Sequence, residues 1–423
     1  PLTVRLPRGD WRLADGSPLP RQPARSGGDW VQLLGPQGVA AVPLERRPLD
    51  SRSQRGLPEG AGEVPGAIDS PVISRPSGVE GHHWLGNGLL AVQVGPQGVE
   101  QLWSQDGVSQ LKAPLEWRRW RDRGAVWDAW DLADDYRDHP LPLEWDGPPE
   151  PLDQGPLCAG FRWRGRCGTS ALRLELRLRA ACPWLELILA VDWRQTHELL
   201  RLELPLARRA ERWAADTSGG VIERPAEALT ARERSRWELP AISWLASQTG
   251  NAGGLAVLLD GPQGVSASAE RLGVSLLRGP TWPDPGADRG HQRLRVALLP
   301  LPGSWRAGAV PQQAVRFREP LWLRPAGPGS GLESDVGDGL HLGHPDLQLL
   351  GLKVEGPSPQ GPVLLLSAQN LGPCRRWLAL PRGWTVLERI DGLPGLKEDA
   401  PDDGLLLRPW QLARWRLRRS SSA

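Results

Sequence analysis

Hydrophobic and polar residues alternate with a period of two along many stretches of this chain, which is the pattern of half-buried β-strands. In residues 172–178 every second residue is leucine and the others are charged. Similar stretches occur at residues 184–193, 200–206, 294–300 and 414–418. Because successive side chains of a strand point to opposite faces, such a segment predicts one face in a core and one face in water.

Helical patterns are scarce by comparison. Few windows keep an apolar stripe at helical spacing, and 43 prolines and 50 glycines interrupt most of them. Three copies of Gly-Pro-Gln-Gly, at residues 35–38, 95–98 and 261–264, lie between apolar stretches and are typical of type I turns in hairpins or strand connections. Their irregular spacing does not indicate a propeller or a solenoid. We therefore expect an all-β chain of antiparallel β-sandwiches.

The composition changes at two places, which predicts several domains in a chain of 423 residues. Residues 51–81 are rich in Pro, Gly, Ser and charge, and residues 326–331 form a second break. The expected order is a small β domain (1–50), a linker (51–81), a central β-supersandwich (82–325) and a C-terminal β-sandwich domain (332–419).

Charge and cysteine content exclude several classes of protein. The 51 basic and 49 acidic residues leave a formal net charge of +2, which argues against a nucleic-acid binder. No apolar run reaches the length of about 18 residues that a membrane-spanning helix needs. The four cysteines form no Cys-x-x-Cys pair, which argues against a disulfide framework and against thiolate-bound zinc. The chain contains no methionine, so we expect it to be a piece of a longer protein.

Motifs that would carry catalysis or bind a metal ion are not apparent. The sequence has no Gly-x-Ser-x-Gly, His-Glu-x-x-His or P-loop motif. His344 and Asp346 have a spacing that metal ligands use, but two residues are a weak signal, and the turn-prone sequence around Pro345 is the interpretation that we favour. We therefore predict no catalytic residue and no metal ligand in this chain.

Two dense polar clusters are candidates for binding. In the first, Trp127 and Trp130 alternate with Asp128 and Asp131, a combination that can hold a sugar by stacking and hydroxyl hydrogen bonds. Alternatively, the two rings pack inward while the acids cap a loop, which is the interpretation that we favour. The second cluster, residues 276–291, is a long polar loop between two alternating strands. Such loops often carry function, but an Arg–Asp network that merely orders the loop would explain it equally.

The second cluster resembles a known family. Residues 275–291 are similar to the LLR-x-P…PD…AD-x-G-x-H signature of glycoside hydrolase family 38 α-mannosidases. Four further segments resemble family landmarks in the right order: the WDAWD element at 127–131, a W-x-E-x-H-x-x-L stretch at 191–200 with Gln195 in place of the usual acid, a G-x-I-x-R-P turn at 219–225, and an FE-x-P…W…G-x-A-L-L-N-D run at 237–260. The resemblance covers nearly the whole chain.

In this family the zinc ion, its ligands, the aspartate nucleophile and the acid/base lie in an N-terminal β/α barrel. The resemblance therefore implies a chain without them, whose central domain has a galactose-mutarotase-like fold. It also implies that Arg278 reaches toward the sugar site of the barrel, with Asp284, Asp288 and His291 as supports of its loop. Together with Trp127 and Asp128, these are the predicted substrate-binding residues.

The function that the resemblance implies is the C-terminal, non-catalytic portion of a retaining, zinc-dependent exo-α-mannosidase. Its expected partners are the barrel of the same polypeptide and mannosyl glycans, it should be inactive alone, and the cytoplasm is the expected location. The alternative is a stand-alone carbohydrate-binding or structural module, suggested by 22 tryptophans against 2 phenylalanines and 1 tyrosine. An exposed row of tryptophans would favour the module, and one apolar face flanking Arg278 would favour the missing barrel. A mutarotase-type enzyme is a third hypothesis.

Overall fold

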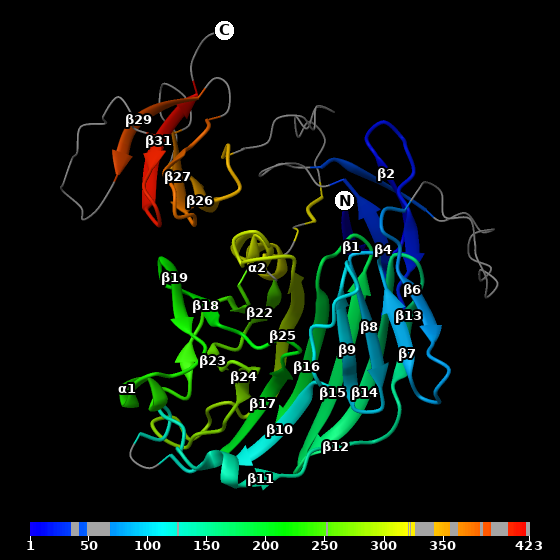
Figure 1. Ribbon diagram of the computed structural model, residues 1–423. Coiled ribbons are helices and arrows are strands. Elements are labelled where there is room, and N and C mark those ends of the chain that lie inside the picture. The colour runs from blue at the N-terminus through cyan, green and yellow to red at the C-terminus, as the bar shows by residue number, and fades with distance from the viewer. Residues whose placement is uncertain are drawn as a thin grey trace.

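The architecture is all-β, as the alternation predicts. The computed structural model describes residues 1–34, 42–48, 68–124, 127–250, 253–319, 321, 323–325, 342–355, 363–380, 384–390 and 405–419. Strands dominate these residues, and the pairs that form the sheets are antiparallel (Figure 1). The expected class of antiparallel β-sandwiches is therefore confirmed.

The central part of the chain is a large two-layer sandwich. One layer is a ten-stranded sheet, in spatial order β12 (Glu144–Trp145), β14 (Cys158–Cys167), β15 (Ser170–Arg179), β16 (Leu185–Trp193), β25 (Gly290–Leu301), β22 (Gly254–Asp260), β21 (Trp244–Gln248), β18 (Arg212–Thr217) and β19 (Gly220–Pro225), with β13 (Glu150–Gln154) paired to β14. The other layer contains a six-stranded sheet, β11 (Pro140–Leu141), β10 (Glu116–Arg121), β17 (Glu198–Pro205), β24 (Arg271–Leu277), β23 (Gly264–Ala267) and β20 (Leu239–Pro240). A four-stranded sheet, β6 (Ile73–Pro76), β7 (His83–Gly86), β8 (Leu90–Gly95) and β9 (Gly98–Ser104), completes it.

A single hydrophobic core joins these sheets, because the inward-facing residues of all three contact one another. Leu176 and Leu187 come from the ten-stranded sheet, Leu202 and Val274 from the six-stranded sheet, and Val92 from the four-stranded sheet. Each of these side chains is at most 1% exposed. The alternating leucines of the sequence are thus the interior of the sandwich.

A small N-terminal unit packs against this sandwich. It contains a three-stranded sheet, β1 (Leu2–Leu6), β4 (Asp29–Leu33) and β3 (Arg21–Pro23), and a two-stranded one, β2 (Asp10–Leu13) and β5 (Leu44–Arg47). Thr3 Oγ1 donates to the carbonyl of Ala180 at 2.9 Å, and Gln22 Nε2 donates to that of Cys158 at the same distance. These buried hydrogen bonds fix the unit to the end of β14 and β15.

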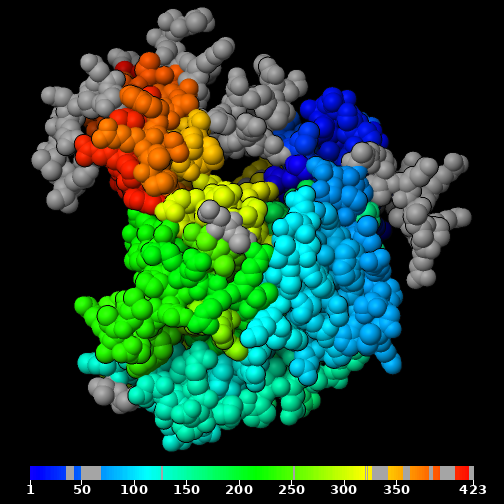
Figure 2. Space-filling model, viewed as in Figure 1, coloured from blue at the N-terminus to red at the C-terminus, as the bar shows by residue number. Residues whose placement is uncertain are grey.

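The C-terminal unit is a separate small β structure. Its four-stranded sheet has the order β26 (Leu347–Val354), β27 (Val363–Asn370), β31 (Leu412–Arg419) and β29 (Trp384–Ile390), and β28 (Arg376–Trp377) pairs with β30 (Leu406–Leu407). It contacts the central sandwich near α2 (Val310–Arg318), where the ring of Trp410 lies 6.4 Å from that of Trp305. In Figures 1 and 2 both terminal units lie at the same end of the sandwich.

The five alternating segments are strands, as predicted, and they correspond to within one residue to parts of β15, β16, β17, β25 and β31. The turn at residues 95–98 joins β8 to β9 in a hairpin, whereas the turn at 261–264 connects β22 to β23 in a different sheet. The third copy, at 35–38, and the break at 326–331 lie outside the described residues.

Two local features differ from the pattern. β6 lies inside residues 51–81, the segment expected to be a linker, and it pairs with β7. The sheets of the central sandwich therefore begin before residue 82. The helix α2 was not expected; besides it, the described residues contain a short α1 (Ala231–Arg234) and a 3-10 turn at Tyr136–Asp138. Val310, Ala314 and Phe317 are all buried on one face of α2. Their spacing in the sequence is the pattern of an amphipathic helix, and it could have predicted α2. The domain boundaries themselves stay a prediction.

Candidate functional site

The two polar clusters of the sequence meet at one end of the sandwich. The segment after β10 carries Trp127 and Asp128, and the segment between β24 and β25 carries Arg278. The start of β17 lies between them, since the backbone N–H of His197 donates to the carbonyl of Gly279 at 2.9 Å and that of Asp122 donates to the carbonyl of His197 at 2.8 Å. In Figure 1 this end, marked by β11, is opposite the N-terminal and C-terminal units.

Arg278 is held by a buried carboxylate. Its Nε donates to Oδ2 of Asp122, whose side chain is fully buried, and the side chain of Arg278 itself is 12% exposed. Oδ1 of Asp122 accepts the backbone N–H of Ala133 at 2.8 Å, so one carboxylate ties together both clusters. Gly124 allows this close packing, because a Cβ there would lie 2.9 Å from an Arg278 nitrogen and 3.2 Å from the Cα of Asp128.

Asp288 and Asp284 shape the loop that follows Arg278. Oδ2 of Asp288 accepts the backbone N–H groups of Arg278 at 2.7 Å and Gly279 at 2.9 Å. Oδ1 of Asp284 accepts the backbone N–H of Gly286 at 2.8 Å, a local turn contact on an exposed part of the loop. Both acids therefore order the loop from within.

His291 lies elsewhere. It is the second residue of β25, its side chain is 92% exposed, and its Nδ1 lies 3.8 Å from Oδ1 of Asp192 on the neighbouring strand β16. The structure thus brings Arg278, Asp288, Trp127 and Asp128 together, with Asp284 on an exposed part of the same loop, and leaves His291 near the start of β25, an inner strand of the ten-stranded sheet.

Asp128 is the point at which the two clusters are joined. Its Oδ2 accepts the backbone N–H groups of Thr281 at 2.7 Å and Trp282 at 3.1 Å, and it lies 3.2 Å from Nε2 of His197. Burial alone would raise the pKa of Asp128, but the hydrogen bonds from Thr281, His197 and Trp282 outweigh it and lower the pKa to about 2. The carboxylate is therefore ionised at neutral pH and fixes the position of Trp282.

This lowered pKa predicts a pH-dependent contribution to stability. Because the pKa in the folded state lies below the ordinary value of 3.8, Asp128 stabilises the fold above about pH 4, and the contribution is lost as the pH falls toward 2. The variant Asp128→Asn should be less stable than the natural chain at pH 7, and the difference should shrink between pH 4 and pH 3. Urea denaturation at a series of pH values measures this.

The control for this prediction is Asp131→Asn. Asp131 is exposed and its Oδ1 accepts only the adjacent N–H of Leu132 among the interactions of the described residues. This variant should differ little from the natural chain at every pH. A destabilisation by Asp128→Asn that is the same at pH 3 and pH 7 would show that ionisation of Asp128 plays no part.

Three tryptophans cover this region with exposed rings. Trp127, Trp130 and Trp282 are 58%, 63% and 53% exposed. The ring centroid of Trp130 lies 6.2 Å from that of Trp127 and 5.2 Å from that of Trp282, with edge-to-face geometry in both pairs. The favoured sequence interpretation, in which Trp127 and Trp130 pack inward, is therefore wrong. The loop side chains that pack inward include Leu132 and Tyr136, which join Trp120 and Leu199 in a small core.

Sequence reasoning gave no role to three residues of the site. Asp122 is a buried ion-pair partner, His197 has a left-handed backbone with φ of 53°, and the Thr281 hydroxyl lies 3.1 Å from Asp128 and 3.2 Å from His197. No motif marks Asp122 or Thr281, because their role comes from contacts distant in sequence. His197 was visible only as part of the stretch at 191–200.

A metal ion has no evident site among the described residues. No group of three or more His, Cys, Asp or Glu side chains in these ranges could hold one. His344 Nδ1 lies 3.4 Å from Asp346, whose carboxylate is engaged by Arg376 at 2.8 Å. The absence of a metal ligand from this chain stays a prediction. Burial also raises the pKa of the Cys167 thiol to about 12, so this thiol is protonated at neutral pH.

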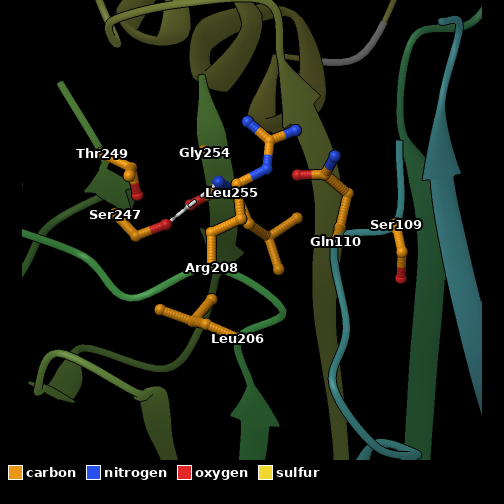
Figure 3. A pocket seen from close by; sticks show the side chains of 8 residues that line it. All are labelled: Ser109, Gln110, Leu206, Arg208, Ser247, Thr249, Gly254 and Leu255. Atoms are coloured by element: carbon orange, nitrogen blue, oxygen red, sulfur yellow. Dashed lines mark hydrogen bonds between the residues drawn. The ribbon is translucent and has the colours of Figure 1, made fainter. Parts of the chain in front are cut away.

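A small pocket lies at the other end of β17 (Figure 3). It is lined by residues after β9, after β17 and around the β21–β22 turn: Ser109, Gln110, Leu206, Arg208, Ser247, Thr249, Gly254 and Leu255. Ser247 Oγ exchanges hydrogen bonds with the backbone of Leu255 at 3.0 and 3.2 Å, as in a strand connection. Because β17 begins beside Arg278 and ends before Leu206, the pocket is separate from the tryptophan cluster. No helix in the described ranges has both the length and the hydropathy needed to cross a membrane.

Comparisons with known proteins agree on one family. Residues 85–286 match the profile described as "Glycosyl hydrolases family 38 C-terminal domain". The chain is 28% identical over 262 residues to "Alpha-mannosidase 2C1" of Homo sapiens, which covers 58% of this chain and 24% of that protein. It is 28% identical over 207 residues to "Alpha-mannosidase G" of Dictyostelium discoideum, which covers 48% of this chain and 19% of that protein.

A solved structure extends the likeness of the fold to nearly the whole chain. The structure titled as an alpha-mannosidase from Enterococcus faecalis V583 superposes with a TM-score of 0.67 at 13% identity, over 98% of this chain and 51% of that one. The chain thus spans about a quarter of the human relative and about half of the Enterococcus protein. The matched domain contains the Trp127, Asp128 and Arg278 clusters described above. Residues 85–286 of this chain thus correspond to the C-terminal domain of glycoside hydrolase family 38.

Proposed function

We propose that this chain is the C-terminal, non-catalytic portion of a retaining, zinc-dependent exo-α-mannosidase that removes terminal α-linked mannose. Two carboxylates of a preceding catalytic barrel would serve as nucleophile and acid/base. The chain itself would hold one wall of the active site in place. We also propose the cytoplasm as its location.

The observation that carries this proposal is the position of the exposed indoles. In the part of the chain that the structure describes, the exposed tryptophans are Trp127, Trp130, Trp282 and Trp377. Three of them form one cluster on the two loops that Asp122 and Arg278 hold together. A row of tryptophans along the molecule would favour a stand-alone binding module, whereas rings gathered at one end beside Arg278 support one wall of a site that another domain completes.

The role proposed for Arg278 follows from its contacts. Asp122 fixes its Nε and Asp288 fixes its backbone N–H, so the guanidinium has one preferred orientation. A fixed guanidinium can orient a carboxylate or bind sugar hydroxyls where a second domain approaches. Asp284 and Asp288 would then support substrate binding indirectly, by ordering the loop.

The experiment compares this chain with the longer protein encoded by its gene. We expect an aryl α-mannoside to be hydrolysed by the longer protein and not by residues 1–423 alone, and we expect the preceding sequence to contain a His-x-Asp zinc motif. Arg278→Ala in the longer protein should lower kcat/KM by at least about tenfold. Turnover by the purified chain alone, or a gene product that ends at the mass of 46.3 kDa, would overturn the proposal.

A further inference from the structure

The Arg278–Asp122 ion pair of the site is buried, and the tryptophans are exposed. Arg278 is 12% exposed and Asp122 is fully buried, so the ion pair lies beneath the surface. The rings of Trp127, Trp130 and Trp282 are each more than half exposed. At roughly 250 Å² for a whole indole side chain, the three rings present on the order of 400 Å² of largely apolar surface. A patch of this size on a monomer is commonly a binding site.

The polar groups beside the rings indicate what this patch binds. Trp130 is followed by the exposed Asp131, and Trp282 is followed after one residue by the exposed Asp284. Each of these carboxylates accepts one backbone N–H, and a dry protein interface would desolvate the charge without supplying a further donor, which is costly. A sugar has an apolar CH face for an indole and a rim of hydroxyls that can donate to carboxylates.

The backbone that carries these rings is also ordered before any ligand arrives. Asp128 Oδ2 accepts the N–H of Trp282, and the backbone N–H of Trp130 donates to the carbonyl of Trp127 at 3.0 Å. Neighbouring rings are inclined by 86° and 60°, so a pyranose stacked on one indole would have a second indole beside it. Prior ordering of this kind reduces the entropy lost on binding.

From these observations we propose that Trp127, Trp130 and Trp282 form a platform for a mannosyl residue of the substrate, next to the wall that Arg278 supports. The inference rests on the proposed function, which supplies the α-mannosyl class of ligand. The sequence expectation gave the contact with the sugar to Arg278. Here the indoles make the direct contacts with the sugar, and Arg278 and Asp122 position the indoles.

The test titrates the full 423-residue chain with α-1,2-, α-1,3- and α-1,6-mannobiose, by calorimetry and saturation-transfer NMR, with cellobiose as the comparison sugar. We expect at least one mannobiose to bind with a Kd of about 1 mM, more tightly than cellobiose. Trp130→Ala, which removes the ring that contacts both others, should weaken this binding at least tenfold. Trp377→Ala is the matched control, since Trp377 is 58% exposed and lies in the C-terminal unit.

Three results would overturn the inference. These are no detectable binding of any mannobiose at about 20 mM, equal affinities in the Trp130→Ala and Trp377→Ala variants, or a concentration-dependent dimer that Trp130→Ala abolishes, which would identify a second copy as the occupant. Failure of this inference can be distinguished from failure of the proposed function. If the longer protein hydrolyses mannosides while this chain binds no mannobiose, only the platform is refuted.

Discussion

Replacing Arg201 by methionine is expected to lower the free energy of unfolding by about 3–5 kcal/mol. Arg201 and Glu203 lie on β17 with fully buried side chains, and Nε of Arg201 donates to Glu203 at 3.0 Å. Burial alone would lower the pKa of Arg201, but Glu203 and Glu238 outweigh it and raise the pKa. Without the guanidinium, Glu203 would be a buried charge whose strongest partner is gone. Urea denaturation monitored by circular dichroism measures the loss.

The surroundings of Arg201 are built for a guanidinium. It also donates to Glu238 at 3.1 Å and to the hydroxyls of Ser266 and Ser275. A Cβ at Gly273 would overlap the same guanidinium, so the glycine provides the space in which it lies across β24. Methionine fills part of this volume but satisfies none of these acceptors.

The double variant Arg201→Met/Glu203→Leu separates charge from packing. Removing both charges abolishes the fully buried pair, and such a replacement is often neutral or stabilising. Glu238, whose side chain is 18% exposed, loses its contact with Arg201 in the single and the double variant alike, so the comparison isolates Glu203. The double variant should therefore be more stable than Arg201→Met alone by at least about 2 kcal/mol. Equal stabilities of the single and the double variant would show that the buried charge of Glu203 is not the cause.

Arg201 also shows where sequence reasoning succeeds and where it stops. The alternation at residues 200–206 correctly predicts a strand with Leu202 and Leu204 in the core. It predicts that the other face, with Arg201 and Glu203, lies in water. A period of two shows only that the two faces of a strand differ in polarity, and it does not show that the polar face is exposed. On β17, loop residues such as Tyr136 cover the polar face.

The site was predictable to a similar extent. The residues of the two clusters were found because each cluster is continuous in the sequence and resembles a family motif. Their joining was not predictable, because it depends on single residues such as Asp122 and His197 that lie far from Arg278 along the chain. The orientation of Trp127 and Trp130 was predicted incorrectly, since composition does not tell which side of a loop faces solvent.

Asp122→Ala is expected to be the most disruptive change at the site itself, with a loss of about 3 kcal/mol in the free energy of unfolding. The variant leaves the largely buried guanidinium of Arg278 without its carboxylate and the N–H of Ala133 without its acceptor. Both loops should then loosen. Hydrogen exchange at the amide of Ala133 should accelerate, and denaturation should show the reduced stability.

Two further variants, Asp122→Asn and Asp131→Ala, separate the loss of the charge from the loss of the hydrogen bond to Ala133 and from the general cost of changing this loop. The asparagine keeps an oxygen that can accept the N–H of Ala133 but carries no charge, so its loss should be intermediate. Asp131→Ala removes an exposed carboxylate from the same loop and should cost less than about 0.5 kcal/mol. If Asp122→Ala were no more destabilising than Asp131→Ala, the ion pair would not hold the loops together. The tryptophan cluster would then depend on Asp128 alone for its position, and Asp128→Asn should release it in an otherwise stable fold.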